Sequence, residues 1–209
     1  MTDSELAPRR RDAEENRAAL RVAASAALNL DPDASLDTIA TDAGLSRRAV
    51  YGHFASRDEL VGVVLEVGVA RVVAALAEVR HPDPLVRLAL IGARLWREVE
   101  SVRVMARFAV RGPFQARIAV ALEPLRRQVL DAIVEGVAAG TVRDDIDPAV
   151  LARLVEGAAL SVLDEATRTG MDSATGHRLV MLSALAIVGL DAKGARELIT
   201  TTPELTALG

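Results

Sequence analysis

Apolar residues recur at helical spacing along almost the whole chain. They fall three or four positions apart, and no segment alternates apolar and polar residues as a half-buried strand does. The pattern predicts an all-α protein of about nine or ten helices. The expected helices cover residues 12–28, 36–43, 47–54, 57–79, 85–100, 102–110, 113–139, 148–169, 173–190 and 192–200.

Local signals mark the ends of the early helices. Ser35 and Ser46 stand where an N-cap side chain accepts backbone N–H bonds. Gly44 fits the left-handed position that closes a helix. Ser56 and Glu59 have the Ser-x-x-Glu spacing of a capping box, which predicts the start of a long helix.

These signals divide the chain into two parts. Residues 1–56 are expected to form a three-helix head that contains a helix-turn-helix, with the first eight residues disordered. Residues 57–209 are expected to form a helical bundle. The break at His81, Pro82, Asp83 and Pro84 is the best candidate for a change of direction in that bundle.

The short helix at 47–54 carries polar groups suited to reading DNA. A recognition helix presents donors from its first turn to the major groove, and arginine can bind guanine O6 and N7 with two hydrogen bonds. Tyr51 and His53 follow one turn later, and Arg57 at the next helix start favours a phosphate. The candidate DNA-binding residues are Ser35, Ser46, Arg47, Arg48, Ala49, Tyr51, His53 and Arg57.

Four of these residues also have a simpler interpretation. Arg47 and Arg48 are alternatively solvated surface charges, Tyr51 a half-buried core residue, and His53 a surface histidine that covers its neighbour. Arg9, Arg10 and Arg11 form either an arm for the minor groove or a solvated tail.

The run IATDAGLSRRAVYGHFASRDEL resembles the N-terminal signature of the TetR family of repressors. The resemblance covers about residues 18–65, and it implies an α-helical homodimer whose head binds a palindromic operator. It also implies a body with a small-molecule pocket and a dimer face. Three positions depart from the family pattern: Leu36 where a second hydroxyl is common, Gly52 inside the recognition helix, and Arg57 in place of lysine.

Charge restricts how such a protein can bind DNA. The 209 residues have a net charge of −4, and the first 60 hold eight arginines against eleven acids. Phosphate contacts favour binding only where the cations sit, so the footprint must be a local patch.

Composition excludes several other classes of protein. The chain has no cysteine. It has three histidines, and no two of them have the spacing of metal ligands. No catalytic constellation stands out, so we expect neither an enzyme nor a cofactor. No uninterrupted apolar run approaches the roughly 18 residues of a membrane span, and no signal-peptide pattern stands at the start. The expected location is the cytoplasm.

Large side chains in the expected bundle are candidates for an effector pocket. Aromatic residues make up only 2% of the chain, so leucine, valine, isoleucine and alanine must supply most of any lining, and the effector is expected to be small and largely apolar. The alternative is that these side chains are ordinary core. The pocket candidates are Trp96, Met105, Phe108, Arg111 and Phe114.

Two late helices carry more apolar surface than one neighbour can cover. A stripe runs along 148–169, and 179–190 is apolar almost all round. A four-helix interface between two subunits explains this pattern, and burial inside one subunit is the alternative. The expected interface residues are Leu151, Leu154, Val155, Ala158, Val162, Leu179, Leu182, Leu185 and Ala186.

Together these features predict a ligand-responsive transcriptional repressor that binds operator DNA as a homodimer. Two alternatives stay open: a DNA-binding dimer without a ligand switch, and a helical enzyme or carrier.

Overall fold

A computed structural model describes the backbone of residues 3–207 and the side chains from Glu14 onward. No strand occurs among the described residues, so the predicted all-α class is confirmed. The chain divides into two compact units. We call them the head unit, residues 1–68 with Val104–Gln115, and the body unit, Val69–Arg103 with the residues from Ala116 onward.

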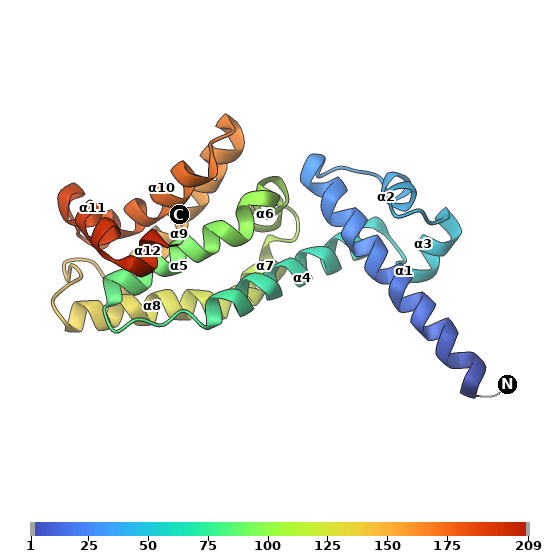
Figure 1. Ribbon diagram of the computed structural model, residues 1–209, viewed down its shortest axis with the longest axis horizontal. Helices are drawn as coiled ribbons and strands as arrows, with labels where there is room; N and C mark the ends of the chain where they lie inside the picture. Colours follow the sequence, from blue (N-terminus) through green and yellow to red (C-terminus); the bar gives the residue numbers. More distant parts are fainter. Residues whose placement is uncertain (1–2, 208–209) are drawn as a thin grey trace. The chain divides into compact units, whose positions relative to one another are not determined.

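The head unit is a small helical cluster (Figure 1). Its elements are α1 (Asp3–Leu30), α2 (Leu36–Asp42), α3 (Arg47–His53), the first half of α4 (Arg57–Ala77) and most of α6 (Arg103–Arg111). The first three helices contact one another in every pairing. Their shared core consists of side chains at most 1% exposed, among them Leu20, Leu28, Ile39, Val50 and Phe54.

Helix α6 joins the head unit through polar contacts with α1. The Ser25 hydroxyl donates to the Met105 sulfur at 3.8 Å, and the Met105 backbone N–H lies 3.4 Å from the Asn29 side-chain oxygen. The sequence does not predict this placement, because nothing in the local pattern of 102–110 distinguishes a head helix from a body helix.

The predicted helix ends around the helix-turn-helix are confirmed. Ser35 Oγ accepts from the Thr38 N–H at 3.0 Å and Ser46 Oγ from the Ala49 N–H at 3.2 Å. Gly44 has φ +68°, in the left-handed region. These caps fix where α2 ends and α3 begins, and therefore which residues occupy the first turn of α3.

The capping box at the start of α4 is also present, with one shift. Ser56 Oγ accepts from the Glu59 N–H at 3.1 Å, as predicted. The Glu59 carboxylate accepts from the Ala55 N–H at 2.7 Å, one residue earlier than in the usual motif.

The body unit is a bundle built around α5 (Pro84–Val99). The other body elements are the second half of α4, η1 (Glu100–Val102), α7 (Gln115–Ala121), α8 (Glu123–Ala138), α9 (Pro148–Thr169), α10 (Ser173–Ile187), α11 (Ala192–Thr201) and α12 (Pro203–Thr206). Helix α5 contacts α8, α10, α11 and α12, and α9 packs between α8 and α10 (Figure 1).

Glycine is required where α10 crosses α5. A Cβ at Gly176 would overlap the indole ring of Trp96. The largest aromatic side chain of the body therefore lies directly against a residue with no side chain.

Three differences from the expected helices are larger than shifts of up to three residues at a helix end. The predicted helix at 113–139 is two helices, α7 and α8, because Pro124 lacks the N–H that would continue a helix and instead occupies the first turn of α8. Helix α1 begins at Asp3 and not at residue 12. The four-residue α12, which Pro203 starts, was not expected, so residues 3–207 hold twelve α-helices.

The compact units do not coincide with the predicted domain boundary at 56/57, because α4 contributes to both units and α6 belongs to the head unit. The boundary between functional domains stays a prediction. Of the first eight residues, for which disorder was expected, residues 3–8 lie in α1, and Met1 and Thr2 lie outside the described residues.

Helix α4 is long and apolar enough to cross a membrane by length and composition alone. The absence of such a segment, expected from the sequence, is therefore not confirmed. Of the apolar window, 44% is buried within the protein, and the core helix of a soluble protein meets the same criterion. Leu60 and Val61 are fully buried.

Candidate nucleic-acid interface and body sites

The first turn of α3 presents two arginines to solvent. Ser46 caps the helix, and Val50 anchors it to the head core with no exposed surface. Arg47 and Arg48 are both exposed, and Arg48, two positions before Val50, lies on the opposite side of the helix from it. The sequence prediction that these two side chains share an accessible helix start is consistent with this geometry.

Arg47 is held by two neighbours. Its Nη1 lies 3.2 Å from Asp37 Oδ2 on α2, and its guanidinium carbon lies 5.7 Å from the centre of the Tyr51 ring. A hydrogen bond with Tyr51 and the charge of Asp37 raise the pKa of Arg47 above its ordinary value. Arg47 is therefore a fixed cation at the surface of the head.

The other predicted DNA contacts differ in how open they are. Tyr51 is 49% exposed, His53 and Ala49 are half-buried, and Ser46 is exposed. Ser35 is exposed, but its hydroxyl already caps α2 and lies 2.8 Å from the Thr38 hydroxyl.

Two residues near this surface were missed by sequence reasoning. Leu36, which stands where the family often has a second hydroxyl, is buried in the core, and the exposed Thr38 places a hydroxyl beside Ser35. Asp37 was counted only as an unfavourable acid. The spacing of Asp37 from Arg47 gives no signal, because the two residues lie on different helices.

Arg57 has a structural role that the sequence did not predict. Its Nε donates to the Ala34 carbonyl at 2.8 Å, and its Nη2 donates to the Pro32 carbonyl. A longer ion pair joins it to Asp58 at 3.8 Å. The guanidinium thus ties the start of α4 to the loop before α2, and the phosphate contact expected of Arg57 stays a prediction.

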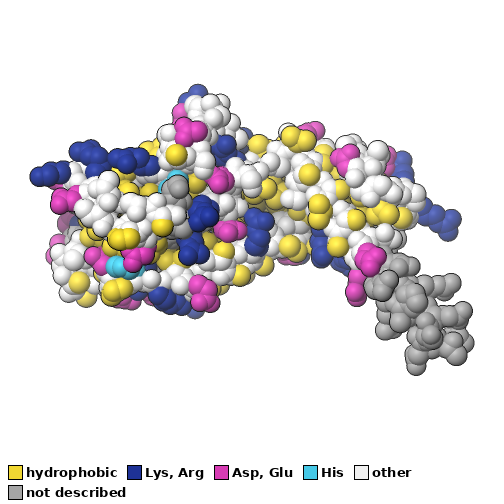
Figure 2. All heavy atoms as spheres, in the orientation of Figure 1, with side chains coloured by type: hydrophobic (Ala, Val, Ile, Leu, Met, Phe, Trp, Pro, Cys, Tyr) yellow, Lys and Arg dark blue, Asp and Glu magenta, His cyan; other side chains and the backbone are white. Residues whose placement is uncertain are grey.

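Basic residues form no continuous surface on the visible face of the molecule. Figure 2 shows arginine and lysine side chains interspersed with acidic ones across the described residues. The arrangement fits the expectation of a local footprint. The side chains of Arg9, Arg10 and Arg11 lie outside those that the structure describes.

The five pocket candidates fall into the two different units. In the head unit, Met105 is buried, Arg111 is exposed, and the Phe108 and Phe114 rings meet edge to face with centres 6.1 Å apart. In the body unit, Trp96 is 2% exposed. Their role as pocket residues stays a prediction.

Trp96 lies in a small apolar cluster with Val162, Ala166 and Val180. The Arg103 guanidinium lies 5.8 Å from the indole and donates to the carbonyls at the end of α9. Neither the Trp96 Nε1 nor the His177 Nε2 has a hydrogen-bond partner in the described protein, and both side chains are at least 95% buried. Burial, with the nearby charge of Arg97, lowers the pKa of His177, and Glu100 partly opposes this.

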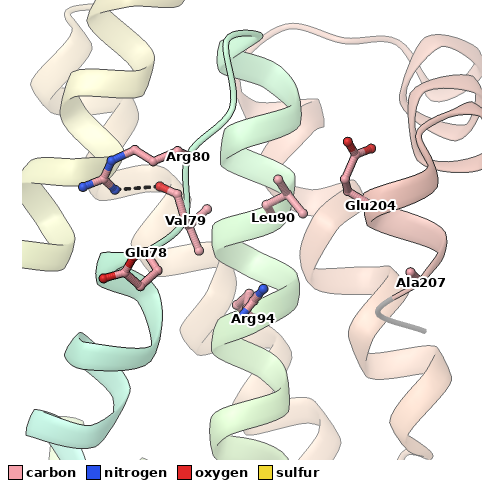
Figure 3. Close-up of a pocket in the computed structure, with 7 residues that line it drawn as sticks. All are labelled: Glu78, Val79, Arg80, Leu90, Arg94, Glu204 and Ala207. Atoms are coloured by element: carbon pink, nitrogen blue, oxygen red, sulfur yellow. Dashed lines mark hydrogen bonds between the residues drawn. The ribbon is translucent and has the colours of Figure 1, made fainter.

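One hollow in the body unit has a volume of about 320 Å³ (Figure 3). Leu90 and Val79 contribute apolar surface, and four charged residues stand at the rim. The charged side chains do not converge on one point, since Arg80 turns back to the Val79 carbonyl at 2.8 Å. None of the predicted pocket residues lines this hollow, whose lining is Glu78, Val79, Arg80, Leu90, Arg94, Glu204 and Ala207.

The nine expected interface residues separate into two sets. Leu151, Val155, Val162 and Leu185 are buried within one chain, so the body core already explains their apolar character. The remaining five keep accessible surface; they are Leu154, Ala158, Leu179, Leu182 and Ala186. Only the accessible apolar surface of this second set is left for a partner subunit to cover.

No group of three or more metal-ligating side chains occurs among the described residues. Two acids of the loop before α9 have other partners: Asp147 caps α9, and Asp145 pairs with Arg143 at 2.7 Å.

Comparison with known sequences identifies the head. Residues 32–64 match the sequence model of bacterial regulatory proteins of the tetR family. This segment of the chain is similar in sequence to the N-terminal module of the TetR family. The match spans α2, α3 and the start of α4, where the sequence showed its resemblance, and that prediction is confirmed.

Solved structures share the fold over most of the chain. They include SmeT, the repressor of the Stenotrophomonas maltophilia multidrug efflux pump SmeDEF, with 22% identity and a TM-score of 0.67 over 84% of this chain and 91% of that one. A TetR-family regulatory protein from Rhodococcus RHA1 has 23% identity and a TM-score of 0.69 over 84% and 98%. The regulator FadR from Bacillus subtilis, in complex with stearoyl-CoA, has 14% identity and a TM-score of 0.68 over 82% and 97%.

At these identities the likeness establishes the fold: a helix-turn-helix head joined to a helical body. The solved neighbours named here are described as a repressor and regulators. No curated protein matches the chain significantly.

Proposed function

We propose that this TetR-type chain is a transcriptional repressor that binds a palindromic operator as a homodimer in the cytoplasm. The observation that carries the proposal is the exposed first turn of α3, where Arg47 and Arg48 stand on a helix that Val50 anchors in the head core. Such a turn fits the major groove, and each bidentate contact with guanine discriminates by about 1–3 kcal/mol.

A homodimer follows from symmetry and from the surface of the body. A palindromic site requires two heads related by a two-fold axis. The accessible apolar residues of α9 and α10 offer a self-complementary face, with Leu154 47% exposed. Small residues such as Gly157 and Ala158 allow close approach of a second pair of helices.

Release by a small, largely apolar effector is the finer part of the proposal. The stearoyl-CoA complex of FadR is a neighbouring case of a long apolar ligand on this fold. Two buried polar atoms without protein partners, on Trp96 and His177, are suitable contacts for the polar end of such a ligand. A ligand acts as an inducer if it binds more tightly to the dimer that cannot span the operator.

The alternative of a DNA-binding dimer without a ligand switch is favoured by one observation. Trp96 is packed tightly against Gly176, and the hollow of the body unit is lined by none of the predicted pocket residues. Screening small molecules for release of bound DNA separates the two functions.

The DNA-binding assignment is tested with the double variant R47A/R48A. It should fold as the wild type does and lose sequence-specific binding. The control is R80A/R94A, which removes two exposed arginines from the body unit and should bind as the wild type. Retained specific binding by R47A/R48A contradicts the site assignment.

A further inference from the structure

Two adjacent arginines at the start of α3 differ in their freedom. Arg47 is paired with Asp37 and lies against Tyr51, whereas Arg48 is exposed and makes no hydrogen bond or ion pair with the described residues. Both stand in the first turn of the same helix, so the difference comes from α2 and from Tyr51 one turn later.

The contacts of Arg47 restrict its orientation. Nη1 faces the Asp37 carboxylate, which leaves Nη2 and Nε without an ion-pair partner. A guanidinium held in one orientation loses less rotamer entropy when it binds than a free one does. Arg47 is thus prepared for an acceptor pair of fixed geometry, such as guanine O6 and N7.

Asp37 also changes what Arg47 contributes to binding without sequence preference. The Asp37 side chain is 56% exposed and lies in the first turn of α2, close to Arg47. A carboxylate at this distance offsets the attraction of the arginine for phosphates, which is the main source of non-specific affinity.

We propose that Asp37 is a specificity-determining residue: it positions Arg47 for a guanine edge and suppresses non-specific phosphate binding by the same side chain. Asp37 acts through Arg47 and is a positioning residue. The proposal rests on the DNA-binding function proposed above. It gives Asp37 a role in DNA recognition although its negative charge repels phosphates.

The test compares D37N with D42N. Both variants remove one negative charge from an exposed position on α2, but only Asp37 contacts Arg47. The preferred site is first selected from random duplexes with the wild type. Binding of that site, its single-base variants and a random duplex is then measured over a salt series.

D37N should lose about tenfold in discrimination at one base pair of each half-site, the amount expected when one bidentate contact loosens. Its affinity for random DNA should rise, with a salt slope steeper by about 0.9, the value of one added phosphate contact. D42N should keep the wild-type discrimination at every position. In the R47A background, D37N should have no further effect at that base pair. In the otherwise wild-type protein, D37E keeps the carboxylate and should keep the wild-type pattern.

The outcomes separate this proposal from the proposed function. If the wild type enriches a sequence and D37N behaves as D42N does, net charge alone explains the effect of Asp37 on DNA binding, and the role assigned to Asp37 is wrong. An equal loss at every base pair also contradicts it. If the wild type enriches no sequence, the proposed function itself fails.

Discussion

Three arginines of the head unit differ in the contacts that their guanidinium groups make. Arg48 is open, Arg47 is held by an acid and an aromatic ring, and Arg57 is committed to backbone carbonyls. A count of arginines in the motif treats all three as equal. The contacts leave the first two at the surface, as the proposed recognition of DNA requires, and give the third a structural task.

Arg57→Lys should lower the free energy of unfolding by about 1–2 kcal/mol, because lysine keeps the charge but cannot donate to both loop carbonyls. Urea unfolding measures the change, with R48K as the control for an exposed arginine. The salt slope of DNA binding by R57A should equal that of the wild type. A slope lower by about 0.9 with unchanged stability indicates instead that Arg57 contacts a phosphate.

His177 makes stability depend on pH. Its folded-state pKa lies below the ordinary value of 6.5, so the unfolded chain binds the proton more readily. Stability is therefore full above about pH 6.5 and falls as the pH drops through and below that value. Thermal unfolding between pH 7.5 and pH 5 should show this loss, and H177Q should reduce it while H53Q retains it. An unchanged pH profile in H177Q contradicts the assignment to His177.

At the scale of the helix, glycines in the head differ in what they contribute. Gly44 needs its positive φ of +68° to end α2, whereas Gly52 lies inside α3 with ordinary backbone angles and open space around its Cα. The same substitution should therefore have opposite effects at the two positions.

Gly52→Ala should stabilise the protein by up to about 1 kcal/mol, through a lower entropy of the unfolded chain and better helix propensity. Gly44→Ala should destabilise it by about 1–2 kcal/mol, because a Cβ is strained in the left-handed region. Urea unfolding of both variants checks the signs. A destabilising G52A indicates that α3 requires flexibility at its centre.

The helix-turn-helix could be predicted almost to the residue because its signals are local. Ser35, Gly44 and Ser46 each act within four positions of the chain. The break between α7 and α8 was missed although Pro124 marks it, because apolar spacing continues through residues 113–139. The pairing of Asp37 with Arg47 depends on how two helices pack, which spacing within one segment does not encode.

For the whole molecule, the proposed dimer depends on the surface of α9. Four of the expected interface residues are buried within one chain, because a helix that packs between two others buries more of its circumference than a stripe suggests. Leu154 is the large apolar residue of α9 that one chain leaves exposed.

Leu154→Glu should convert the proposed dimer to a monomer and lower operator affinity at least tenfold, because a single head makes half of the contacts. The matched control is Val120→Glu, a position 77% exposed on α7. Sedimentation at micromolar concentration measures the assembly. A dimeric L154E, or equal effects of the two variants, places the interface elsewhere.

Selection of bound sequences from a random DNA pool, with purified full-length protein at physiological salt, tests the central claim most directly. The account predicts a palindromic consensus for the wild type and none for R47A/R48A. No enrichment by folded wild-type protein, or the same consensus from the double variant, contradicts it.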